Sequence, residues 1–144
     1  MVTYNDIINA FKEFADNHEQ INSFYSGQTW NFQAQENLYT SFIVMPTTSN
    51  IVRGESSILF TIIIADMLNN DRTNRDYIFS NTLQIAQDFF STFDNNEDDW
   101  FIEGTEGMTA EPFEEELNDV LCGWILYVNI NFPFSGNICV LPIS

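Results

Sequence analysis

Positive charge is what this sequence most lacks. Only four of its 144 residues are Lys or Arg, against 21 Asp and Glu, so the formal net charge is −17 at pH 7. Proteins that bind nucleic acid tightly use Lys and Arg to release the counterions of the phosphate backbone. We therefore expect no tight nucleic-acid binding. Three interpretations of the acidity stay open: solubility, a salty environment, and a surface that must repel another polyanion.

Histidine is nearly absent too, and with it the usual means of proton transfer. His18 is the single histidine, and it lies among polar residues at the end of a predicted helix. Serine and cysteine hydrolases need a histidine placed for general-base catalysis. The sequence also has no Walker phosphate-binding motif and no dinucleotide-binding glycine motif. We expect no catalytic residues, no metal ligands and no cofactor, and a hydrolase that uses two carboxylates is the enzymatic alternative.

Cysteine and long apolar segments are also scarce. Cys122 and Cys139 lie in separate apolar segments without the paired spacing of a disulfide or zinc site, so we expect reduced, buried thiols. The longest apolar run, residues 58–65, is far shorter than the ~20 residues of a membrane helix, so we expect no membrane association. The N-terminal residues lack the basic and apolar parts of a secretory signal, which favours a protein that stays in the cell that makes it.

Two segments have the apolar periodicity of helices. Residues 4–16 follow Thr3, which suits a helix N-cap, and Asp6 lies in the first turn, so we expect a helix that ends near His18. Residues 75–93 form the strongest helical pattern of the chain. Its wide apolar stripe predicts a helix that lies across a sheet or between partners.

Strand patterns fill much of the remaining sequence. Residues 39–45 predict a strand that Pro46 stops, and residues 47–50 read as a loop before a turn near Arg53. The β-branched residues of 57–67 predict a central strand that is covered on both faces.

Further strands are expected at residues 100–103, 124–132 and 138–141. Neither a repeat nor a linker divides the chain, so residues 1–144 should form a single domain. The predicted fold is α+β, with a mostly antiparallel sheet, an N-terminal helix and a second long helix packed across the sheet.

Acidic residues gather in two places. Asp94, Asn96 and Asp98 match the first ligands of a calcium loop, but Asp99 replaces the required glycine and Thr105 the required glutamate, which favours a solvated loop. The second cluster, Glu111-Pro112-Phe113-Glu114-Glu115-Glu116, is typical of an exposed strand edge, where charge opposes unwanted pairing. Both clusters are candidates for a surface that repels DNA, with these members: Asp94, Glu97, Asp98, Asp99, Glu114, Glu115 and Glu116.

A few aromatic and proline residues lie in or beside loop-like segments rather than at core periodicities. Apolar rings in such places are hard to bury within one small domain, and they are enriched where subunits meet. The candidate contacts between subunits, or with docking partners, are Trp30, Phe32, Phe132, Pro133 and Phe134.

The order of these elements resembles that of the tail-terminator and neck-ring proteins of tailed bacteriophages, which are small α+β subunits. The resemblance covers nearly the whole chain. It rests on the two helices, on the strand at 57–67 and on a closing pattern that runs from Pro112-Phe113 through Asp119 and Gly123-Trp124 to Cys139-Val140-Leu141-Pro142.

The resemblance implies a structural virion protein with no enzymatic activity. Such a subunit would assemble in the host cytoplasm into a sixfold or twelvefold ring of the head–tail connector, neck or tail terminator. Its partners would be its own copies and the adjacent portal, neck or tail proteins, and DNA would pass through the ring during genome ejection without being held. The alternative is an acidic monomeric binding module, such as an immunity protein, an inhibitor or a DNA mimic, for a basic partner.

Overall fold

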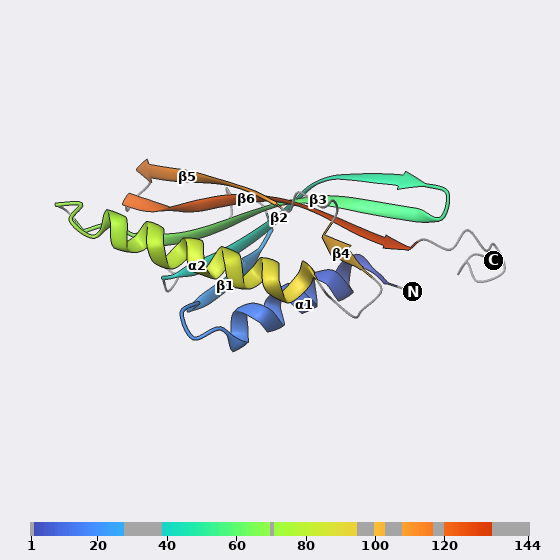
Figure 1. Ribbon diagram of the computed structural model, residues 1–144, viewed down its shortest axis with the longest axis horizontal. Coiled ribbons are helices and arrows are strands. Elements are labelled where there is room, and N and C mark those ends of the chain that lie inside the picture. The colour runs from blue at the N-terminus through green and yellow to red at the C-terminus, as the bar shows by residue number, and fades with distance from the viewer. Residues whose placement is uncertain are drawn as a thin grey trace.

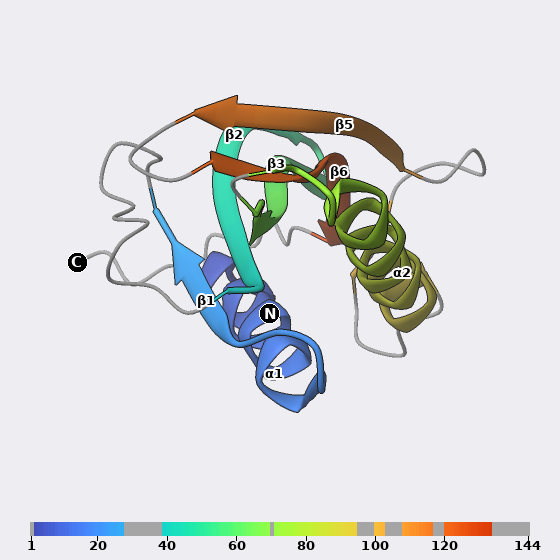
Figure 2. The ribbon, with the colours of Figure 1, turned by 90° about the vertical axis from the view of Figure 1, so that its left-hand side faces the viewer.

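The computed structural model describes residues 2–27, 39–69, 71–94, 100–102, 108–116 and 120–133, and these residues form an α+β fold. Both helices lie on the same side of one sheet, as the two perpendicular views show (Figures 1 and 2). The predicted fold class is therefore confirmed. In chain order the elements are α1 (Tyr4–Asn17), β1 (Ser23–Ser26), β2 (Ser41–Val52), β3 (Glu55–Met67), α2 (Arg75–Asp94), β4 (Phe101–Ile102), β5 (Thr109–Glu116) and β6 (Val120–Pro133).

The start of α1 follows from a reciprocal pair of capping hydrogen bonds. The backbone N–H of Thr3 donates to Oδ2 of Asp6 at 2.9 Å, and the backbone N–H of Asp6 donates to Oγ1 of Thr3 at 3.2 Å. The pair satisfies two donors that a helix otherwise leaves unpaired at its first turn. The helix ends at His18, whose backbone is extended. Both predicted ends of this helix are confirmed.

The described residues form a sheet of six strands in the order β1-β2-β3-β6-β4, with β5 also paired to β6. Among these strands only β1 and β2 run parallel, and the other pairs are antiparallel. β3 pairs with β2 on one side and with β6 on the other, so its predicted central position is confirmed. The strands expected near residues 100 and 124 are present as β4 and β6. The strand expected at 138–141 lies outside the described residues.

The prediction that β3 is covered on both faces was wrong. Its residues alternate along the strand between buried and partly exposed positions. The buried set, which includes Phe60, Ile62 and Ile64, faces α1 and α2 and joins the main core. Leu59 and Ile63 lie on the opposite face and are only partly buried. An unbroken run of β-branched residues is typical of a two-sided strand, yet here both helices pack on one side.

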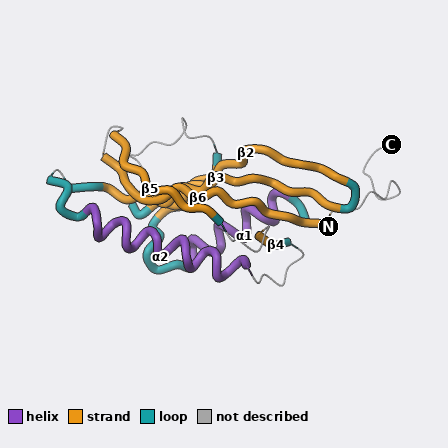
Figure 3. The backbone as a smooth tube through the Cα atoms, turned by 45° about the horizontal axis from the view of Figure 1, so that its top comes forward, coloured by secondary structure: helices purple, strands orange, loops and turns teal. Residues whose placement is uncertain are grey.

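The prediction that Pro46 ends its strand and that residues 47–50 form a loop was also wrong. β2 continues to Val52 and pairs with β3 up to the turn, with a bulge between Pro46 and Thr48 (Figure 3). β1 pairs with β2 only as far as Val44, so Pro46 lies in an edge segment. Proline lacks an N–H, and sheets tolerate it at edges and bulges. Gly54, at φ +85°, supplies the positive φ of the turn.

Aromatic side chains hold the helices against the sheet. The ring of Phe11 in α1 lies 5.3 Å from that of Phe60 in β3 and 5.2 Å from that of Phe89 in α2, measured between centroids. Trp100 stacks on Phe93 at 5.2 Å, just before β4. Buried side chains from α1, α2 and the sheet form this one main core. Edge-to-face and offset ring pairs of this kind add to the free energy gained from apolar burial.

Candidate functional site

The end of the sheet farthest from β5 gathers two of the predicted contact residues with two that the sequence did not point to. Ser56 of β3 pairs with Ile51 on one side and with Phe132 on the other, while Glu55 pairs with Val52 and Pro133. We define the distal sheet end as Ile51, Val52, Arg53, Phe132 and Pro133. Its hairpin projects beyond the helices (Figures 1 and 3).

Exposed apolar side chains mark this distal sheet end. The exposed fraction is 68% for Ile51 and 51% for Val52. Pro133 is exposed as well, whereas Phe132 is partly buried against the main core. Sequence analysis missed Ile51 and Val52 because it placed a loop at 47–50. The available signal was the β-forming sequence that continues past Pro46 up to the glycine turn.

The charge of the distal sheet end differs from that of the rest of the chain. β2 contains no Asp or Glu, and the exposed Arg53 follows it in the turn. Within the described residues Arg53 has no ion-pair partner, whereas Lys12 pairs with Asp16 at 2.7 Å. The outer strand of the hairpin is thus free of acids and leads into an arginine, on a molecule of net charge −17, and Glu55 is the first acid after the turn.

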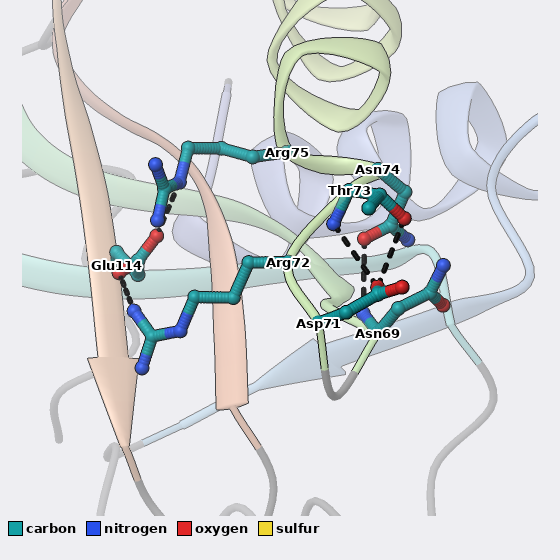
Figure 4. Close-up of polar contacts among 7 residues, drawn as sticks. All are labelled: Asn69, Asp71, Arg72, Thr73, Asn74, Arg75 and Glu114. Carbon is teal, nitrogen blue, oxygen red and sulfur yellow. Dashed lines mark hydrogen bonds and ion pairs between the residues drawn. The ribbon is translucent and has the colours of Figure 1, made fainter.

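Glu114, a candidate for the DNA-repelling surface, is instead paired with two arginines (Figure 4). Arg72 donates from Nη1 to Oε2 of Glu114, and Arg75 donates from Nε to Oε1 at 2.7 Å. The contacts tie β5 to the start of α2. Glu114 therefore does not present an uncompensated negative charge, and the sequence could not show this because its partners lie 39 and 42 residues away.

The loop before α2 is ordered by its own side chains (Figure 4). The backbone N–H and the hydroxyl of Thr73 both donate to Oδ1 of Asp71, at 3.2 and 2.9 Å. These hydrogen bonds lower the pKa of Asp71. The backbone N–H of Asn69 donates to Oδ1 of Asn74 at 2.9 Å. The loop thereby places Arg72 and Arg75 opposite β5.

The remaining acidic candidates are only partly placed. Asp94 is the exposed last residue of α2, and Glu115 and Glu116 belong to β5, although their side chains lie outside the described part of the structure. The other candidates lie outside the described residues: Trp30, Phe32, Glu97, Asp98, Asp99 and Phe134. Most of the possible calcium loop is among them. Within the described ranges, no group of three or more His, Cys, Asp or Glu is arranged to hold a metal ion.

Glu111, the first acid of the second cluster, is exposed on β5 but was not among the candidate DNA-repelling residues. The hydroxyl of Tyr127 donates to its Oε2 at 3.2 Å. Desolvation and this hydrogen bond raise the pKa of Tyr127. The carboxylate is exposed on the outer strand of the sheet.

An open cleft of about 580 Å³ separates the end of α1 from α2, and His18 lies in its wall. Nε2 of His18 is 2.8 Å from Oδ2 of Asp88, and the backbone N–H of Gln20 donates to Nδ1 at 3.1 Å. Because Nδ1 accepts a hydrogen bond, Nε2 must carry the proton and donate it to Asp88. Both ring nitrogens take part in hydrogen bonds, and the contact with Asp88 ties the end of α1 to α2.

Cys122 of β6 is buried against the first turns of α2, which confirms that part of the sequence prediction. Burial, with smaller contributions from Glu114 and Asp66, raises the pKa of its thiol to about 11. A neutral thiol is a poor nucleophile and a poor metal ligand. Cys139 lies outside the described residues.

No helix in the part of the chain that the structure describes has the length and apolar character needed to cross a membrane. No protein-family model and no curated protein matches the chain.

Proposed function

We propose that this chain is a structural subunit of a ring in the head–tail connector, neck or tail-terminator position of a tailed bacteriophage virion. The observation that carries the proposal is the distal sheet end. Apolar residues are exposed there on a projecting hairpin, beside an edge segment that no described strand covers. Exposed apolar groups and open strand edges attract other proteins. The protein therefore acts through contacts with its own copies and with the portal, neck or tail proteins beside it.

The acidic surface fits the proposed position around a DNA channel. Exposed carboxylates occur on both helices, at Asp6, Glu13, Asp16, Asp76 and Asp94. A sixfold or twelvefold ring repeats each of them around its axis, and the summed negative potential repels a passing phosphate backbone. DNA then crosses the ring without being retained, which suits genome ejection.

The first experiment measures the assembly state. Size-exclusion chromatography with light scattering, followed by electron microscopy of negatively stained particles, should show closed rings at high protein concentration or after addition of a portal complex. Ile51→Ser should reduce the ring fraction, while Tyr77→Ser, at an equally exposed site on α2, should not. Duplex DNA should not bind the isolated protein at physiological salt.

The alternative, an acidic binding module for a basic partner, predicts a different outcome. Such a protein would stay monomeric at every concentration and would bind a cationic protein with an affinity that falls steeply with salt. That result would overturn the ring proposal.

A further inference from the structure

The outer edge of β2 is open beyond its short contact with β1. β1 pairs with Ser41 to Val44 only, and no other described strand pairs with the outer side of residues 46–52. All seven of these residues are exposed. Their sequence, Pro-Thr-Thr-Ser-Asn-Ile-Val, carries none of the charged residues by which edge strands ordinarily oppose pairing.

A second open edge lies diagonally across the sheet. β5 pairs with residues 120–127 of β6, and no described strand pairs with its other side. Four of its eight residues are Glu, and Pro112 removes one backbone donor. Two copies of β5 would repel each other, because like charges would face across the new pair. Pairing between two copies of β5 is therefore disfavoured. The outer edge of β5 still has backbone N–H and C=O groups that could pair with a different strand.

The two edges differ in charge in the sense that favours their pairing. Residues 46–52 have no acid and lead into Arg53, which has no ion-pair partner among the described residues, whereas β5 presents Glu111 as an exposed carboxylate. Glu55, beyond the turn, belongs to β3 and not to the open edge. The open segments are of similar length, seven and eight residues. Between copies that each carry −17, an acid-free edge is also where self-repulsion is weakest.

We infer that residues 46–52 of one copy pair with the outer edge of β5 in a second copy, so that the six-stranded sheet continues from subunit to subunit. Arg53 then faces the glutamates of that neighbouring β5. Because the two edges are different surfaces, the contact is heterologous, and its repetition closes a ring or extends a filament. The inference rests on the proposed ring and names the contact that would build it.

Cross-linking tests the pairing directly. In a Cys139→Ser background, Ile51→Cys and Thr109→Cys place thiols at exposed positions on the two edges, and Cys122 stays buried. A short bismaleimide should join an equal mixture of the two variants into mixed dimers. A mixture of Tyr77→Cys and Thr109→Cys is the matched control, because Tyr77 is as exposed as Ile51 but lies on α2, and it should give little product. Dimers formed mainly between two Ile51→Cys chains would overturn the inference.

Charge reversal supplies a second, independent test. Arg53→Glu alone and Glu111→Arg alone should each weaken self-association about tenfold, and the double variant should recover most of the loss. Closed rings could instead form without the mixed cross-link and with unchanged affinity in both single variants. That result would overturn the edge pairing and leave the ring proposal intact. A protein that is monomeric at every concentration would overturn both.

Discussion

Ile51 and Phe132 lie on the same face of the sheet, separated by Ser56, which pairs with both. One of the two is largely exposed and the other packs partly against the core. Because of this difference, Ile51→Ser and Phe132→Ser should differ in their effect on stability, which the sequence alone does not predict.

Ile51→Ser should change the free energy of unfolding by less than about 0.5 kcal/mol, because an exposed side chain loses little burial. Phe132→Ser should cost about 1–3 kcal/mol, because part of its ring leaves the core. Both should impair assembly. Urea denaturation and size-exclusion chromatography measure the two effects separately, and an equal loss of stability in both variants would contradict the placement of Ile51.

Gly123→Ala should destabilise the protein severely, by about 3 kcal/mol or more. A Cβ at Gly123 would lie 1.9 Å from the carbonyl oxygen of Ile64, in the pair of strands at the centre of the sheet. A contact this short forces the backbone to shift. Substitutions that do so are among the most destabilising in a packed core. Gly54→Ala is the control, since only its positive φ opposes a side chain there, at a cost of about 1 kcal/mol. Thermal denaturation should rank the two variants in this order.

Glu114→Gln should lower stability by no more than about 1 kcal/mol, because the Arg72 and Arg75 pairs are partly exposed to solvent. The loss should shrink in 1 M salt, where exposed charges are screened. Glu111→Gln makes no difference to these arginines and serves as the comparison. A loss that is unchanged by salt would argue against an ionic link between β5 and α2.

The thiol of Cys122 should stay unreactive in the folded protein. Its pKa in the folded state is about 11, raised from 9.0, so the unfolded chain releases this proton at lower pH than the folded chain does. Between these two values the folded state binds more protons, and the contribution of Cys122 to stability falls as pH rises. In a Cys139→Ser background, alkylation at pH 8 should require urea. Rapid labelling without denaturant would refute the burial.

Replacing Asp94, Glu97, Asp98 and Asp99 by Lys should leave folding intact and cause the assembled ring to retain duplex DNA. The substitutions would turn a repelling segment into one that binds phosphates. Filter binding at two salt concentrations measures the retention. The same number of acid-to-lysine changes at other exposed positions, Glu13, Asp16, Glu19 and Asp76, tests whether position matters beyond total charge. Equal retention by both variants would place the loop away from the channel.

The sequence by itself determined the features that depend on near neighbours along the chain. The start of α1 required only Thr3 and Asp6, and the long helix α2 followed from apolar spacing. The charge of −17 and the single histidine needed no structure at all.

Tertiary structure alone decided which distant groups meet. β2 continues through Pro46, at a position where β1 no longer pairs with it. Glu114 is neutralised by two arginines that the loop before α2 brings to β5. Ile51 and Phe132 lie near each other because both pair with Ser56 of β3. Strand pairing is set by contacts between residues far apart in the chain, whereas helix caps and periodicity act within a turn or two.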